Sequence, residues 1–164
     1  MKREIRLLGD PVLREKAQPV PEVNEELRAL VADMFETMYA AEGVGLAAPQ
    51  IGLGIRVVVI DPQDEETKPF AIFNPEVVSH GTTTEKNEEG CLSIPGVRDV
   101  VERYSTVAVE AVDIEGKPIR IEADGFLARI LQHEVDHLNG VLFLDHLSPI
   151  KRRMALSKWR KGKE

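Results

Sequence analysis

The sequence has one cysteine, one tryptophan and few aromatic residues of any kind, 5% in total. A single cysteine excludes an internal disulfide and fits a reducing compartment, so we expect the cytoplasm. No apolar run approaches the ~20 residues that a helix needs to cross a bilayer. Residues 1–6 are charged and no long apolar core follows them, so a secretory signal peptide is not expected.

The length and composition are those of a single globular domain. The chain has 164 residues, 43% hydrophobic and 30% charged, with a net charge of −7. Residues 148–164 hold seven of the 21 basic groups and one of the 28 acidic groups. Residues 1–147 therefore hold 14 basic and 27 acidic groups, a net charge of −13. We therefore expect one domain over residues 1–147 and an attached basic helix over residues 148–164. Its basic residues are Lys151, Arg152, Arg153, Lys158, Arg160, Lys161 and Lys163.

The spacing of apolar residues predicts an α+β fold, with short, mostly antiparallel strands packed around a central helix and a helix at the C-terminus. A long amphipathic helix is expected over residues 22–42, ended by Gly43. The glycine-rich residues 43–54 are expected to form a loop. The expected strands are residues 55–60, 70–73 and 77–78, and a hairpin that pairs residues 107–112 with 119–121.

The central helix is expected between Asp124, a suitable N-cap, and Gly140. Within it, residues 133–137 read His-Glu-Val-Asp-His, which is an H-E-x-x-H motif. Positions i and i+4 lie one turn apart on the same helix face, so His133 and His137 can bind one metal ion. Glu134 lies beside the first histidine, where it can act on a bound water. This arrangement is typical of a metal-assisted hydrolase and would make residues 1–147 a catalytic domain.

A motif with three fixed letters also arises by chance, for example on a surface helix with two solvated histidines. Here Phe126, Ile130, His133 and His137 fall on one stripe, so the histidines belong to the apolar face of the helix. A buried histidine pair without a partner would be costly, and a metal ion removes that cost. We therefore interpret the two histidines as metal ligands.

A catalytic site of this kind typically has three protein ligands and one open position. The extended motif that ends in a third histidine is excluded, because Phe143 stands at that position. Asp145 and His146 remain alternatives. Cys91 is the better candidate. A lone cysteine is usually a small buried apolar group, but this one stands among an acid, a serine and glycines, which is a poor core position.

Three stretches together resemble the motifs of the peptide deformylase family. Residues 43–50 read GVGLAAPQ, residues 89–93 read EGCLS and residues 133–137 read HEVDH. Their order and spacing also match, and the resemblance runs from about Ile5 to Pro149. The short loop after Ile60 and the basic final helix are similar to the bacterial form.

This resemblance implies an enzyme that removes the formyl group from the N-terminal methionine of newly made polypeptides and releases formate. Glu134 would be the general base and acid, and the Gln50 side chain and the Leu92 backbone N–H would stabilise the oxyanion. The implied metal is usually Fe²⁺, and Zn²⁺, Ni²⁺ or Co²⁺ can occupy the site. The implied metal ligands are Cys91, His133 and His137.

The resemblance also implies a substrate pocket. Val44, Phe126 and Ile130 would line it for the methionine side chain, and ordinary core packing is the alternative role for each of them. Gly43 and Gly45 would let their loop run beside the peptide like an added strand.

Three charged residues are also expected at or near the pocket. Glu89 would contribute to substrate binding. Arg98 would bind Glu89 or a peptide carbonyl, or else be a simple surface arginine. Arg129 stands where several bacterial relatives have an apolar residue, and we expect it at the pocket rim.

Other interpretations remain open. A general metallopeptidase would need histidine or a carboxylate as third ligand. A structural metal site would need a fourth ligand, such as His80 or His146, and would leave Glu134 idle. The basic helix fits a ribosome-binding role, known for bacterial relatives, or else a solvated surface. We expect no membrane partner and no sequence-specific nucleic acid.

Overall fold

A computed structural model of the chain describes residues 1–162. The strands are β1 Gly45–Ala47, β2 Val57–Ile60, β3 Phe70–His80, β4 Thr84–Cys91, β5 Ile94–Tyr104, β6 Thr106–Val112 and β7 Pro118–Asp124. The α-helices are α1 Glu25–Ala40, α2 Gly125–Leu138 and α3 Pro149–Gly162, and the short 3₁₀ helices are η1 Pro11–Arg14, η2 Ala48–Ile51 and η3 Phe143–His146.

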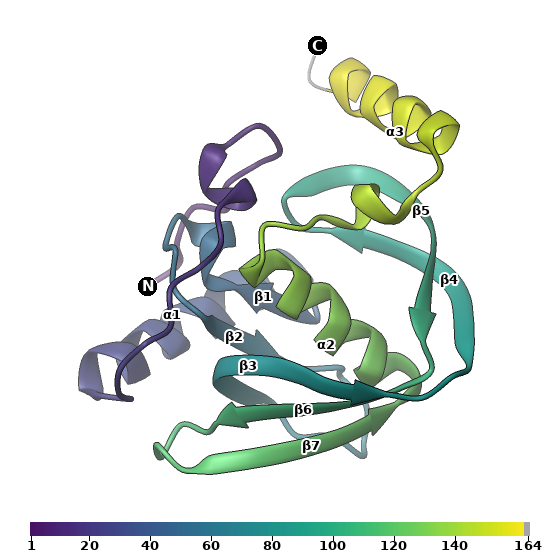
Figure 1. Cartoon of the computed structure of the whole chain (residues 1–164). Helices are drawn as coiled ribbons and strands as arrows, with labels where there is room; N and C mark the ends of the chain where they lie inside the picture. Colours follow the sequence, from purple (N-terminus) through teal and green to yellow (C-terminus); the bar gives the residue numbers. More distant parts are fainter. Residues whose placement is uncertain (163–164) are drawn as a thin grey trace.

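The strands form two separate sheets with α2 between them (Figure 1). One sheet has five strands in the order β1-β2-β3-β6-β7, and the other is the β4-β5 hairpin. Every pairing between these strands is antiparallel. The predicted α+β class, with a central helix and a C-terminal helix, is confirmed.

Helices begin and end where the sequence supplies caps. The Leu27 backbone N–H donates to the Asn24 side chain at 2.9 Å, which starts α1 a few residues later than expected. Asp124 occupies the N-cap position of α2, as expected, but its side chain accepts no capping hydrogen bond. Gly140 follows the end of α2 with φ +75°, a conformation that a residue with a Cβ rarely adopts. In addition, a Cβ at Gly140 would lie 2.5 Å from the Arg14 carbonyl oxygen.

Strand β2 shows how the five-stranded sheet is covered. All four of its residues are fully buried. Val58 and Ile60 belong to the apolar cluster that includes α2, whereas Val57 and Val59 belong to the cluster that includes α1. Successive side chains of a strand point to opposite faces, so one helix covers each face. Helix α2, which carries the H-E-x-x-H motif, is thereby anchored against the sheet.

Three expectations about strands were wrong. Residues 45–47, expected within a loop, form strand β1, and the 3₁₀ helix η2 follows them. The expected short strands at residues 70–73 and 77–78 are one strand of 11 residues, β3, whose register shifts after Phe73. Asn74 has φ +52° and Pro75 follows it, so the polar residue and the proline mark a β-bulge and not a strand end. The β4-β5 hairpin was missed because β4 is exposed over most of its length and shows no alternating apolar pattern.

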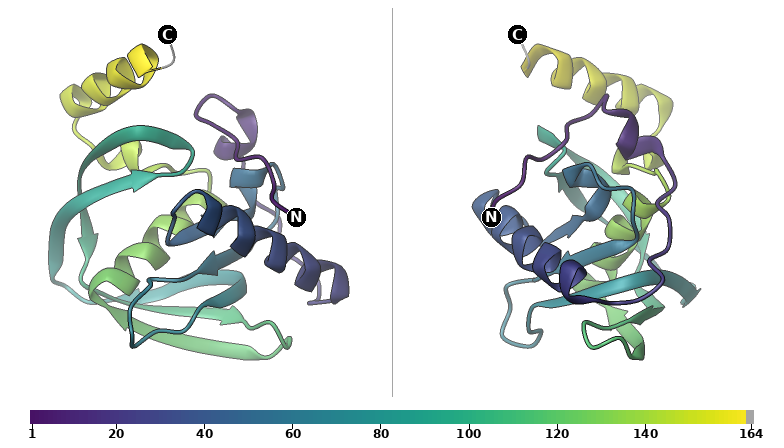
Figure 2. Two further views of the ribbon diagram at one scale, coloured as in Figure 1. Left: turned by 180° about the vertical axis from the view of Figure 1, so that it is seen from behind. Right: turned by 90° about the vertical axis from the view of Figure 1, so that its left-hand side faces the viewer.

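The C-terminal helix packs on the hairpin side of the molecule (Figure 2). Ala155 and Trp159 are buried in a cluster with Ile94, Val97 and Phe143. Ser148 Oγ accepts a hydrogen bond from the Lys151 N–H at 3.3 Å and so caps the helix. Lys163, one of the basic residues counted in this helix, lies outside the described residues. Within residues 1–162, no helix combines the length and apolar character that a membrane crossing requires.

Candidate metal and active site

The three predicted ligands converge in space although they come from two separate elements. Helix α2 places the Nε2 atoms of His133 and His137 3.2 Å apart, and Cys91, at the end of β4, places its sulfur 3.3 Å from His137 Nε2. Bonds of about 2.0–2.3 Å to a tetrahedral ion put ligand atoms roughly 3.3–3.6 Å apart. The two nitrogens and the sulfur therefore fit a single divalent cation.

The alternative ligands are engaged elsewhere. The Asp145 carboxylate binds Arg14 at 2.6 Å, and His146 Nε2 lies 2.8 Å from Asp136. His80 stacks on the Tyr104 ring, with the ring centroids 3.6 Å apart. Among residues 1–162, Cys91, His133 and His137 form the one group of three potential ligands with this geometry. A closed structural site with a fourth protein ligand has no support in this arrangement.

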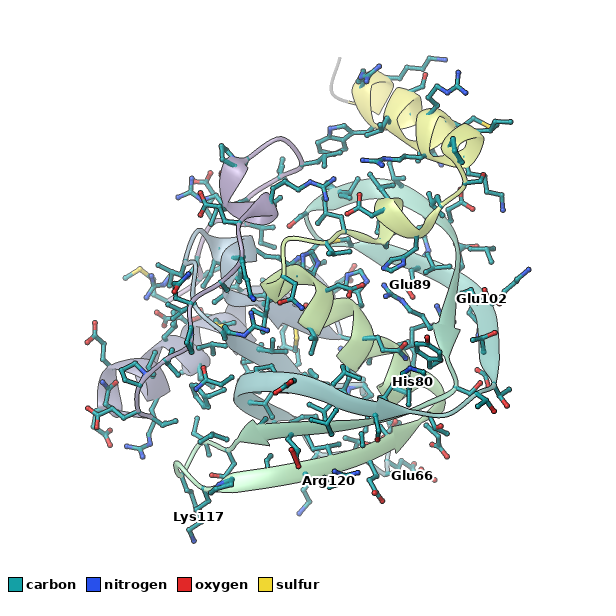
Figure 3. All side chains as sticks on the ribbon, in the orientation of Figure 1. Glu66, His80, Glu89, Glu102, Lys117 and Arg120 are labelled. Atoms are coloured by element: carbon teal, nitrogen blue, oxygen red, sulfur yellow. The ribbon has the colours of Figure 1, made fainter. Side chains whose placement is uncertain are left out.

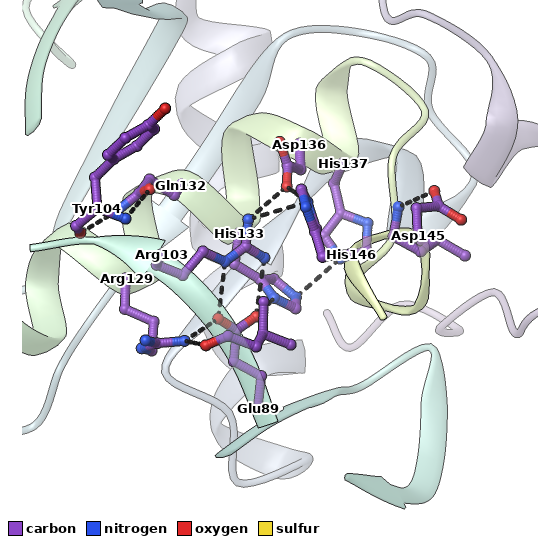
Figure 4. Close-up of polar contacts among 12 residues, drawn as sticks. Glu89, Arg103, Tyr104, Arg129, Gln132, His133, Asp136, His137, Asp145 and His146 are labelled. Carbon is purple, nitrogen blue, oxygen red and sulfur yellow. Dashed lines mark hydrogen bonds and ion pairs between the residues drawn. The ribbon is translucent and has the colours of Figure 1, made fainter. Parts of the chain in front are cut away.

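Glu89 orients the first histidine. Its Oε1 lies 2.9 Å from His133 Nδ1, and the carboxylate also accepts from Arg103 at 2.8 and 2.9 Å and from Arg129 at 2.5 Å (Figure 4). Burial alone would raise the Glu89 pKa, but hydrogen bonds from Arg103 and His133 outweigh it and hold the pKa well below its usual range. The ionised carboxylate holds the proton on Nδ1 and leaves Nε2 free to bind a metal. Glu89 thus supports a ligand, and it also lines the cavity in which a substrate contact was expected.

The second histidine is kept neutral by its surroundings. His137 is 1% exposed, and its Nδ1 has no hydrogen-bond partner among the described residues. Burial, followed by the proximity of His133, lowers the His137 pKa well below its ordinary value. Neutral imidazole is the form that binds metal ions.

Glu134 is a buried carboxylate that faces the site. It is 5% exposed, and its Oε1 has no hydrogen-bond partner within residues 1–162. Burial raises its pKa to about 7. A Cβ at Gly45 would lie 2.7 Å from Glu134 Oε2, so glycine is needed there to let β1 approach the carboxylate. An unpaired carboxyl group with a pKa near neutrality is suited to accept and return a proton.

Gln50 is buried beside the metal ligands, whereas a loop glutamine would ordinarily be exposed. It is 1% exposed, and its Oε1 accepts from the Ala47 N–H at 3.0 Å. Its Nε2 donates to Ser93 Oγ at 3.2 Å and lies 3.5 Å from Cys91 Sγ. The N–H side of the amide is therefore directed at the site. Leu92 follows Cys91 directly, in the turn between β4 and β5.

One cavity of about 930 Å³ connects these groups. Phe126 is 54% exposed at its wall, and buried Ile130 and half-buried Val44 also line it. The lining residues that were not anticipated include two charged ones, Glu42 after α1 and Lys158 on α3. The predicted site residues that line the cavity are Val44, Gly45, Gln50, Glu89, Cys91, Leu92, Arg98, Phe126, Ile130, His133 and Glu134.

Both arginines expected near the pocket line the cavity. Arg98 does not bind Glu89, which was one of its expected roles; its Nε donates to Glu88 at 2.7 Å, and both side chains are exposed, as for a surface arginine. Arg129 is 7% exposed and hydrogen-bonded to Glu89. The arginine that sequence reasoning missed is Arg103, which joins Glu89 to Asp136.

Comparison with known proteins gives consistent matches over nearly the whole chain. The family model described as Polypeptide deformylase matches residues 2–153. A peptide deformylase of Acinetobacter baumannii is 51% identical over 152 residues, 93% of this chain and 86% of the relative. A crystal structure of a peptide deformylase from Legionella pneumophila has TM-score 0.92 and 51% identity, covering 99% of this chain and 96% of that one. A crystal structure of peptide deformylase from Ehrlichia chaffeensis in complex with actinonin has TM-score 0.93 and 41% identity. The match covers 99% of this chain and 98% of that one.

Proposed function

Since the chain belongs to the polypeptide deformylase family, we propose that Cys91, His133 and His137 hold its metal ion and that Glu134 transfers the protons of its reaction. The enzyme is a metal-dependent hydrolase that removes the N-formyl group from the formyl-methionine of newly made polypeptides and releases formate. The observation that carries the site assignment is the meeting of one thiol and two imidazoles at 3.2–3.3 Å beside an unpaired carboxyl group. Nothing in the comparisons favours a general metallopeptidase.

A bound metal ion would lower the pKa of its water ligand towards about 7 and would act as a Lewis acid on the formyl oxygen. Glu134 accepts the proton of the attacking water and later delivers it to the departing amine of methionine. Gln50 Nε2 and the Leu92 N–H donate to the oxygen that becomes negative, and each such donor lowers the barrier by roughly 3 kcal/mol. Glu89 keeps His133 in the tautomer that leaves Nε2 available.

The cavity suits the methionine side chain beside the reacting carbon. Phe126, Ile130 and Val44 supply its apolar wall, and Gly45 brings the β1 backbone close to where a peptide would lie. Arg98 lies on the same wall but is paired with Glu88, so it reaches substrate only as part of that ion pair. Residues 1–147 would form the catalytic domain, to which α3 is attached.

We propose Fe²⁺ as the metal in the cell and the cytoplasm as the location, because a thiolate ligand favours soft or redox-active ions and the single thiol needs reducing conditions. Protein purified without oxygen should contain one iron per chain and release formate from a formyl-methionyl tripeptide. The same preparation should leave unformylated casein intact. Casein cleavage without formate release would instead identify a metallopeptidase.

We also propose that the basic face of α3 binds the ribosome. Arg153 and Lys161 are exposed and make no ion pair among the described residues, so they are available to phosphate groups. Removing the helix would be a poor test, because Ala155 and Trp159 are buried in the body. The double variant Arg153→Glu, Lys161→Glu should lose most co-sedimentation with ribosomes at low salt while releasing formate at the normal rate.

The matched control reverses two exposed lysines away from α3, Lys68→Glu with Lys117→Glu. It changes the net charge equally and should bind ribosomes like the wild type. Binding should also fall with rising salt, since it depends on displaced counterions. Equal binding by both double variants would reject the proposal.

A further inference from the structure

The hairpin that carries Cys91 is not hydrogen-bonded, strand to strand, to the five-stranded sheet. Its apolar residues Ile94, Val97 and Val101 pack in a cluster with η3 and α3, and no member of that cluster comes from α2. The histidines, however, are on α2. Some other contact must therefore set the distance between the thiol and the two imidazoles.

Besides the Gln50–Ser93 hydrogen bond described above, that contact is a polar seam along one face of α2, formed by Arg129, Gln132, His133 and Asp136. These positions follow the i, i+3, i+4, i+7 spacing of one helix face. Each of them bonds to β4 or β5: His133 to Glu89 at 2.9 Å, and Asp136 to Arg103 at 2.7 Å, as Figure 4 shows.

Gln132 binds the hairpin as a neighbouring strand would. Its Oε1 accepts from the Tyr104 N–H at 3.0 Å, and its Nε2 donates to the Tyr104 carbonyl at 2.9 Å. Nε2 also donates to the Ala128 carbonyl at 3.0 Å, within its own helix. Gln132 is 8% exposed, so these hydrogen bonds between helix and strand are largely shielded from water.

Arg129 joins both strands of the hairpin to the helix. Its Nη1 donates to the Val101 carbonyl of β5 at 3.0 Å, and its Nη2 donates to the Glu85 carbonyl of β4 at 2.9 Å. Nη1 also donates to Glu89. Only a planar guanidinium offers several donors in a fixed fork, so no shorter or apolar side chain could reach these acceptors together.

We infer that Arg129 and Gln132 are positioning residues that dock the β4-β5 hairpin on α2 and thereby fix Cys91 relative to His133 and His137. This inference rests on the proposed metal site. Neither residue supplies a ligand atom. Because they act through the hairpin, their loss should alter metal retention and ligand geometry more than the affinity for substrate. Outer-shell partners of this kind typically change metal affinity by about 10–100-fold.

The test compares Gln132→Met and Arg129→Met with the wild type. All three proteins are loaded with Co²⁺ under anaerobic conditions. Two readouts are independent of turnover: the thiolate-to-cobalt charge-transfer absorption, and the rate at which a chelator removes the ion. We expect a weakened or shifted band and release about 10–100-fold faster in both variants. Lysine can reach only some of the acceptors of Arg129. The Arg129→Lys variant should therefore give a band and a release rate between those of the wild type and Arg129→Met. If Gln132→Met does not fold, the two Arg129 variants alone test the inference.

Arg120→Met is the matched control. Arg120 lies on β7, paired with Glu110 and Glu122, and Figure 3 shows it far from Glu89. Its variant should keep the band and the release rate. Thermal unfolding of the metal-free proteins separates general destabilisation from positioning.

Variants that unfold at lower temperature but keep the wild-type band and release rate would overturn the inference, because the seam would then be structural only. The wild-type protein tests the proposed metal site separately. If the wild type binds Co²⁺ without any thiolate band, Cys91 is not a ligand, and both the ligand set and the inference fall.

Discussion

Glu134→Gln is expected to remove nearly all formate release while the metal stays bound. The amide has the size of the carboxyl group but cannot accept the proton of the attacking water. Positioned acid–base groups contribute about 10²–10⁴-fold to rate, so kcat should fall by that factor, which is about 3–5 kcal/mol in the barrier. Glu134 Oε1 has no hydrogen-bond partner among the described residues, so the substitution breaks no hydrogen bond at that atom.

The measurement pairs formate release with metal content on the same sample. KM should change little, because Glu134 is assigned to proton transfer and not to binding methionine. Glu66→Gln is the matched control, since Glu66 is exposed and lies away from the site (Figure 3). Turnover within about tenfold of the wild type would remove Glu134 from its role as general base, because a general base contributes more than that.

The parts of the fold that the sequence predicts are those with strong local signals. Helix α2 was expected between Asp124 and Gly140 with an apolar stripe between them, and the structure confirms these positions and the buried stripe. The β6-β7 hairpin has apolar strands joined by a turn at Gly116, and it too was predicted. In each case the residues that determine the element lie within it.

The missed parts depend on partners distant in the sequence. Strand β4 is largely exposed, so its position follows from pairing with β5 and not from its own pattern. Arg129 lines the cavity as expected, but its burial and its partners were not anticipated. It is buried because Glu89 and two backbone carbonyls satisfy its donors, and sequence spacing does not reveal those acceptors.

Gln50 illustrates a third case. Taken alone, a glutamine in a glycine-rich loop would be exposed, and only the surrounding motif placed it in the site. The structure explains the burial: the Ala47 N–H and the Ser93 hydroxyl satisfy both ends of the amide. The residue type alone did not predict that Gln50 lies in the site, whereas the surrounding motif did.

Cys91→Ser is expected to have the second large effect, and it acts on the metal and not on proton transfer. The hydroxyl preserves the shape of the turn but is a harder and weaker ligand than a thiolate. Loss of an outer-shell partner already costs about 10–100-fold in metal affinity, so loss of a ligand should cost more than about 100-fold. Activity should fall with metal content, and a large excess of metal should restore only part of it.

The two variants separate the roles of neighbouring groups. With Co²⁺, Glu134→Gln should keep the thiolate charge-transfer band and lack turnover, whereas Cys91→Ser should lack the band at any occupancy. Cys91→Ser should also resist the oxidative inactivation that a thiolate beside Fe²⁺ invites. A Cys91→Ser protein that held metal as tightly as the wild type would show that two imidazoles suffice. The 3.3 Å approach of sulfur to His137 would then be a packing contact and not a shared coordination sphere.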